Sequence, residues 1–181
     1  EKSYTVEAQS RFTIWVDQED PSLADTAVSA IVRSINGVPI IVERAMWWPG
    51  NWTTWHEAHN SAGVTETGTK WALAEGEVGG AQRYCTYVLI ANTGPANGQA
   101  KVTLMFESGA PVSKTVELPA NSRTNVDVGV TFPEARDRRF GVVVESLGTT
   151  PAPIVVERAV YSDAGGTHWA AGTNALATKL Q

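Results

Sequence analysis

Two histidines three residues apart, His56 and His59, are the residues of this sequence that most resemble metal ligands. A helical zinc site places its two histidines four residues apart on one face, so their spacing departs from that motif. On a loop they could still bind a metal, with His168 or Asp163 as a third ligand. The alternative is that they satisfy the polar backbone of a turn. We therefore expect no metal and no cofactor, and His56 and His59 are weak candidates.

An internal repeat organises the sequence. The ten residues 39–48 return with few changes as residues 153–162, and shorter matches extend the similarity upstream. Residues from about 4 to 60 therefore repeat in residues from about 114 to 174, whereas the stretch 71–110 occurs once. Self-similarity at a fixed spacing is typical of tandem arrays.

The repeat predicts a partial unit over residues 1–70 and a complete unit over residues 71–181. A half sandwich would leave an open sheet edge and an uncovered apolar face. The simplest solution is that both copies pack into a single body. The other is that a neighbouring chain supplies the missing strands.

Charged residues lie inside the repeated motif Val-Glu-Arg-Ala, which contains Glu43 and Arg44 in the first copy and Glu157 and Arg158 in the second. Neighbouring residues of a strand point to opposite faces, so the adjacent Glu and Arg cannot pair with each other. Each needs a partner elsewhere, because an unpaired buried charge is costly. We interpret the four as a structural charge network and expect both glutamates to be buried and paired. The alternative is a catalytic carboxylate.

Aromatic residues are densest between residues 47 and 56, where four of the seven tryptophans lie. A loop indole offers a flat apolar face to a sugar ring, and large exposed aromatics often mark binding surfaces. The matching stretch of the second copy, residues 162–167, has no aromatic residue, so the repeat does not require them. The alternative is that they cap the junction between the copies or fill an interface with the next unit. The candidate ligand-binding residues are Trp47, Trp48, Trp52, Trp55 and Trp15.

The predicted fold class is all-β, an antiparallel β-sandwich of about eleven short strands built from one and a half internal repeats. Apolar and polar residues alternate over residues 11–17 and 102–106, the pattern of a half-buried strand. Turn residues separate the strand segments, and antiparallel strands with little helix form sandwiches. Further strands are predicted over residues 86–91, 112–118, 123–129, 140–146 and 154–161, and short helical turns over 22–30 and 134–139.

Composition limits the classes of partner. The chain of 181 residues has a net charge of −5, so it lacks the basic surface that nucleic acid requires. No apolar run approaches the length of a membrane span, so no membrane insertion is expected. Only 18% of residues are charged, which suits a secreted β protein better than a cytosolic enzyme. The single cysteine, Cys85, excludes a disulfide scaffold.

Four ordered motifs, within residues 41–48, 57–61, 70–76 and 86–92, carry a resemblance to a known group of proteins. Their order resembles tandem β repeats in large secreted bacterial proteins of unassigned function. The resemblance implies an extracellular, array-forming module without catalysis, and it carries over no catalytic residue.

We therefore expect a non-catalytic extracellular β-sandwich module that binds or displays at a cell surface. Its tryptophan-rich loop would bind polysaccharide or a cell-surface glycan. The alternative is a structural repeat or fibre subunit that contacts only neighbouring modules or copies of itself. A third hypothesis is a glycosidase that uses Glu43 or Glu57.

Overall fold

The computed structural model describes residues 1–51, 54–163 and 166–181, without the side chains of residues 49–51 and 54–56. These residues form two compact units, Glu1–Ile31 and Val32–Gln181. In the described part of the chain, no helix is long and apolar enough to cross a bilayer.

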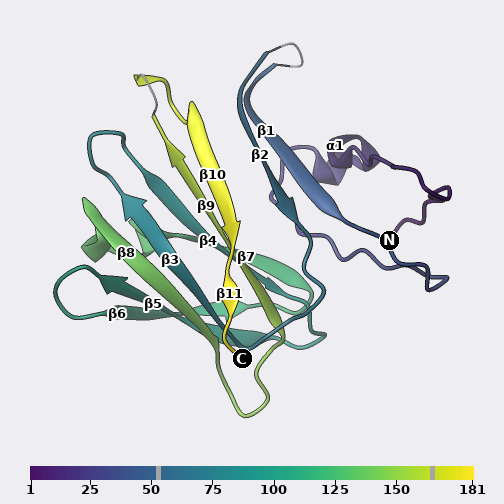
Figure 1. Cartoon of the computed structure of the whole chain (residues 1–181). Helices are drawn as coiled ribbons and strands as arrows, with labels where there is room; N and C mark the ends of the chain where they lie inside the picture. The colour runs from purple at the N-terminus through teal and green to yellow at the C-terminus, as the bar shows by residue number, and fades with distance from the viewer. Residues whose placement is uncertain (52–53, 164–165) are drawn as a thin grey trace. The chain divides into compact units, whose positions relative to one another are not determined.

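The second unit is an antiparallel β-sandwich, so the predicted fold class is confirmed (Figure 1). One sheet has the strand order β10-β9-β4-β7, and the other has the order β11-β3-β8-β5-β6. The strands are β3 Lys70–Val78, β4 Cys85–Asn92, β5 Gly98–Phe106, β6 Val112–Leu118, β7 Ser122–Asp127, β8 Arg138–Ser146, β9 Ile154–Ser162, β10 Ala171–Leu176 and β11 Thr178–Lys179. Two short helices, α2 Val128–Thr131 and η2 Pro133–Ala135, follow β7.

The hydrophobic core lies between the two sheets. Val102 and Leu104 of β5 are fully buried, while Thr103 between them points to the other face of its sheet. Val88 and Ile90 of β4 are buried in the same cluster. Strand side chains alternate between faces, so each sheet buries one face here and leaves its other face for further contacts. The outer face of the β10-β9-β4-β7 sheet carries the candidate site.

Strands β1 Glu43–Asn51 and β2 Thr54–Ala62 form a separate antiparallel hairpin. Glu43 pairs with Ala62 across this hairpin, and Glu157 pairs with Leu176 across β9 and β10. Adding 114 to both residue numbers of each pair from Glu43–Ala62 to Trp48–Glu57 gives a pair in the second hairpin. The β1–β2 hairpin is therefore the structural counterpart of β9 and β10, in the same register.

The predicted strand over residues 11–17 is wrong. Residues 5–42 contain no strand, and the chain forms the short helices α1 Val16–Glu19 and η1 Pro21–Leu23 instead. Asp20 caps η1, because its side chain accepts a hydrogen bond from the Ser22 backbone N–H at 2.9 Å. In the second copy the matching strand β7 pairs with β4, and the sequence holds no second copy of β4. The predicted superposition of the two copies therefore holds only for the hairpin.

Candidate functional site

The β1–β2 hairpin lies against β10, on the outer face of the β10-β9-β4-β7 sheet. In β9 the inward residues Val156 and Arg158 face the other sheet, so Glu157 and Tyr161 point outward. Arg44 and Trp48 of β1 contact these two outward residues. The hairpin of the first copy thus docks on the second copy, and we call this contact the hairpin junction.

An ion pair forms the polar end of the hairpin junction. Arg44 Nη2 lies 2.6 Å from Glu157 Oε1, and Asn174 Nδ2 of β10 donates to the same oxygen at 2.5 Å. Burial lowers the pKa of the Arg123 guanidinium from its ordinary value, Arg44 lowers it further, and Glu157 opposes both. Glu157 is therefore placed to favour the charged forms of both Arg44 and Arg123.

Aromatic rings form the apolar end of the hairpin junction. The Trp48 and Tyr161 rings meet edge to face, with centroids 5.0 Å apart and an interplanar angle of 84°. Tyr161 also stacks on Trp169, with centroids 4.7 Å apart and an angle of 19°. The Trp48 indole Nε1 donates to the Trp169 carbonyl oxygen at 2.9 Å. Each pair of aromatic rings stabilises the folded state by about 0.5–1.5 kcal/mol beyond the contribution of the apolar area that it buries.

A glycine gives Trp48 room to reach the sheet. A Cβ atom on Gly172 would lie 2.5 Å from Trp48 Cζ2 and 2.8 Å from Tyr161 Cδ1. Trp169 is held from the other side, because its backbone N–H donates to Asp163 Oδ1 at 2.8 Å. The Asp163 carboxylate pairs in turn with Arg83 at 2.6 Å. The close approach of hairpin and sheet thus depends on a missing side chain and an anchored loop.

Two reactive groups beside the hairpin junction keep their protons. Burial, together with the nearby Asp127, raises the pKa of Tyr87 to about 12. Burial also raises the pKa of the Cys85 thiol above its usual range. A phenol or thiol in these surroundings is a poor nucleophile near neutral pH.

His59 packs inside the junction. Its ring lies 4.9 Å from Trp48, centroid to centroid, and neither ring nitrogen makes a hydrogen bond within the described residues. Burial lowers the pKa of His59, and the nearby Arg44 lowers it further. No group of three His, Cys, Asp or Glu side chains in the described residues is placed to hold a metal. The His56 side chain lies outside the described residues.

The tryptophans that were predicted to bind a ligand lie in different environments. Trp48 is half-buried in the junction, whereas Trp47 points to the opposite face of the hairpin and is exposed. Trp15, in the first unit, is also exposed. Trp52 lies outside the described residues, and so does the Trp55 side chain.

The two copies of the Val-Glu-Arg-Ala motif have different surroundings. Arg158 is buried with its side chain 5% exposed, and its Nη1 donates to Glu75 Oε1 of β3 at 2.5 Å. Its counterpart Arg44 pairs with Glu157 on the outer face instead. Glu157 is partly buried and paired, but Glu43 is exposed, so the prediction that both glutamates are buried is wrong. Glu43 lies on the hairpin face turned away from the contact, where nothing requires its burial.

The two carboxylates named for a glycosidase lie on opposite faces of the hairpin. Glu57 is the strand partner of Trp48, so it shares the face that carries Trp48 and Arg44. Glu43 precedes Arg44 and points to the other face. Two carboxylates that act on one glycosidic bond must flank it at about 5–10 Å. Glu43 and Glu57 do not have the arrangement of such a pair.

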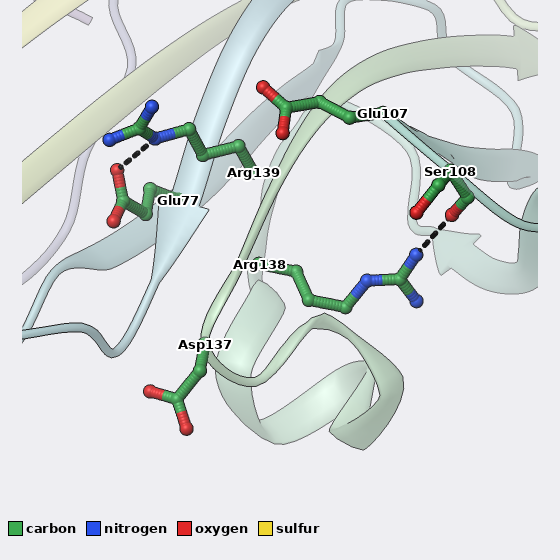
Figure 2. A pocket seen from close by; sticks show the side chains of 6 residues that line it. All are labelled: Glu77, Glu107, Ser108, Asp137, Arg138 and Arg139. Atoms are coloured by element: carbon green, nitrogen blue, oxygen red, sulfur yellow. Dashed lines mark hydrogen bonds and ion pairs between the residues drawn. The ribbon is translucent and has the colours of Figure 1, made fainter.

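A shallow hollow of about 360 Å³ lies elsewhere, at one end of the sandwich. Most of its charged groups pair with other groups of the protein. Glu77 pairs with Arg139 at 3.1 Å, and Arg138 donates to the Ser108 carbonyl oxygen and lies over the Phe106 ring (Figure 2). Asp137 points away from the other labelled side chains and accepts a hydrogen bond from the Gly80 N–H at 2.9 Å. The hollow is therefore an open, charged surface in which Glu77, Asp137, Arg138 and Arg139 already have partners.

Sequence reasoning missed Tyr161, Trp169 and Glu75 as contact residues. The repeat could have pointed to the two aromatic residues. The copies are 114 positions apart, so Tyr161 is the counterpart of Trp47 and Trp169 is the counterpart of Trp55. Glu75 gave no signal, since it lies in a stretch that occurs once. A register shift in β3 between Leu73 and Gly76 accompanies its position beside Arg158.

Comparison with known proteins bears on the fold alone. No protein-family model and no curated protein matches this sequence. Among solved structures, the crystal structure of Thermotoga maritima 1070 matches with a TM-score of 0.54 and 19% identity, over 62% of this chain and 95% of that chain. The Anabaena sensory rhodopsin transducer matches with a TM-score of 0.43 and 25% identity, over 53% of this chain and 91% of its own. The first match shows that the sandwich fold occurs in a known protein.

Proposed function

We propose that this chain is a non-catalytic structural repeat module whose copies contact one another. The observation that carries the proposal is the hairpin junction, in which Arg44 and Trp48 of the first copy meet Glu157 and Tyr161 of the second. An isolated two-stranded hairpin is only marginally stable in water, so its neighbours must hold it in place. The function supported best is therefore to join modules of the same kind.

The likeness of the sequence to secreted bacterial repeats supports a place outside the cell or at its surface. The partners we propose are neighbouring modules of this kind, in the same chain or in another copy. The net charge of −5 and the low charged content agree with this setting. Nucleic acid and membrane insertion form no part of the proposal.

Hydrogen exchange tests the proposal. The amides of residues 43–51 and 54–62 should be protected in the natural chain and should exchange at least ~10-fold faster in Tyr161→Ala, because the ring that supports Trp48 is gone. Amides of β5 and β8 serve as the internal control and should keep their protection. Equal exchange of the hairpin amides in both proteins would show that the hairpin is not held by the sheet.

Glycan binding at a surface is the second candidate, and the exposed Trp47 favours it. An exposed indole on a strand can stack on a sugar ring while Trp48, on the other face, holds the hairpin down. Retention of the natural chain on insoluble polysaccharide, lost in Trp47→Ala, would support this function.

A further inference from the structure

Apolar residues of the first copy are exposed where their counterparts in the second copy are buried. Ile14 is 40% exposed, whereas its counterpart Val126 of β7 is 2% exposed. Val32 is 50% exposed, whereas its counterpart Val144 of β8 is 1% exposed. Val16, Ile40 and Val42 are exposed as well, and their counterparts Val128, Ile154 and Val156 are fully buried. The first copy thus has the apolar pattern of a sandwich half without its covering.

The second copy shows what covers such a half. Its strand β7 pairs with β4, β8 pairs with β3 and β5, and β9 pairs with β4. These partner strands come from residues 70–106, which lie in the stretch that occurs once in residues 1–181. They are already paired with the second copy. Among the described residues of 1–181, the first copy therefore has the residues of one half and no strands left to pair with.

The arginines of the repeated motif, Arg44 and Arg158, also differ in whether a covering half is present. Arg158 faces inward and pairs with Glu75 of β3. Arg44 has the same place in its hairpin, but the first copy lacks a Glu75, and Arg44 pairs with Glu157 on the outer face of the second copy. The hairpin face that docks at the junction is thus the face that would point into the core of a completed first copy.

We propose that residues 2–62 are half of a second sandwich, completed by a half-unit of the kind seen in residues 70–110 and supplied by a neighbouring module. On completion, Arg44 exchanges Glu157 for the Glu75 counterpart of the incoming half-unit, and residues 10–17 and 29–34 become strands. The docked hairpin is the uncompleted state. This inference rests on the proposed function and names the partner of the module.

The partner is recognised by three features of residues 70–110. It carries an acidic residue at the register shift of β3, which reaches the motif arginine. It carries a central strand like β4, whose two edges pair with the counterparts of β7 and β9. It carries apolar residues like Val88 and Val102, which would face the apolar residues of the first copy. A lone extended peptide could add a strand to one sheet but not to both, whereas β3 and β5 lie in one sheet and β4 lies in the other.

An extended protein tests the inference. A second copy of residues 64–110 is placed ahead of Glu1, and residues 1–181 are left unchanged. We expect amides of residues 10–17 and 29–34 to exchange ~100-fold or more slowly than in the natural chain, because strands inside a packed sheet open rarely. Unchanged exchange of both segments would overturn the proposal.

A matched control separates strand completion from mere lengthening of the chain. The same extension with Val88→Asp and Val102→Asp in the added copy cannot form an apolar face, and residues 10–17 should exchange as in the natural chain. Equal protection by both extensions would also overturn the proposal.

The arginine exchange has its own readout. In the natural chain Glu157→Gln should speed exchange of the β1–β2 amides, whereas in the extended chain it should leave them unchanged. Glu75→Gln in the added copy should speed them instead. A hairpin in the natural chain that does not respond to Tyr161→Ala would contradict the proposed function, whereas an extended chain with unprotected residues 10–17 contradicts only the strand completion.

Discussion

Arg44 and Glu157 belong to the two copies of one motif, and their side chains meet with Nη2 and Oε1 2.6 Å apart. The pair joins the inward-type face of the first hairpin to the outward face of the second. Trp48 and Tyr161 repeat the same relationship with aromatic rings. A contact with two such components is specific, since both must align in one register. It accounts for how a hairpin without a sheet of its own keeps its structure.

Replacing Glu157 should loosen the hairpin. We expect Glu157→Gln to lower the free energy of unfolding by about 1–2 kcal/mol, the lower part of the range for a hydrogen bond to a charged group, because Arg44 is partly exposed and solvent screens the pair. Urea unfolding measures this loss. The control is Glu43→Gln at the exposed counterpart, which should change stability by less than about 0.5 kcal/mol. Equal effects of the two substitutions would contradict the role of the ion pair.

A methyl group at Gly172 should push the hairpin from the sheet, because its Cβ would lie 2.5 Å from Trp48. We expect Gly172→Ala to cost about 1–3 kcal/mol, as for overpacking elsewhere. In a Trp48→Ala background the cost should be smaller, since one of the two close contacts is absent. Thermal or urea unfolding of the four proteins gives the coupling. Strictly additive effects would show that Trp48 does not lie over Gly172.

The hairpin should weaken in mild acid. Burial holds the pKa of His59 below its ordinary value of 6.5, so the unfolded chain binds a proton at a higher pH than the folded chain. Stability from this group is complete above pH 6.5 and falls as the pH drops through 6.5 toward the lower folded pKa, by up to about 1.4 kcal/mol per pH unit. His59→Gln should flatten the dependence between pH 5 and 7, measured by urea unfolding. If the free energy of unfolding depends on pH equally in both proteins, groups other than His59 cause the dependence.

The buried arginine should depend on its exposed partner. The Glu75 side chain is 77% exposed, but its loss would leave Arg158 buried without its ion pair. We expect Glu75→Gln to cost about 1–3 kcal/mol, less than for a fully buried pair, and Arg158→Met to be nearly neutral. Comparing the two urea midpoints tests this order. If Arg158→Met lowers the free energy of unfolding more than Glu75→Gln does, the arginine stabilises the core through contacts other than its ion pair.

The complete copy was predictable because its signals are local. Alternating residues near Val102 and the turn at Ser108-Gly109 predict the β5–β6 hairpin that is observed. The same alternation at Ile14 predicted a strand that is absent, since a strand also needs a partner edge, and pattern alone does not report one. The sequence predicted which charged residues form the network, but it did not predict which of them pair with each other. Which carboxylate meets Arg44 depends on a contact between residues 113 positions apart.

Trp47 and Trp48 separate the structural function from glycan binding. Trp48→Ala should lower the melting temperature, because about 2–4 kcal/mol of buried aromatic contact is lost at a half-buried site. Trp47→Ala should leave the melting temperature nearly unchanged, since its side chain is exposed. In a pull-down with insoluble polysaccharide, the structural account expects none of the proteins to be retained. Retention of the natural chain, lost only in Trp47→Ala, would favour the glycan-binding function.

The most direct test of the hairpin junction is a through-space NMR measurement between the Trp48 indole and the Gly172 α protons. The account predicts cross-peaks between these groups, and between the Trp48 and Tyr161 rings, in the natural chain near neutral pH. The same cross-peaks should weaken in Glu157→Gln, while those across β9 and β10 remain. Absence of the Trp48 cross-peaks in a natural chain whose β9–β10 cross-peaks are intact would contradict the docking of one repeat on the other.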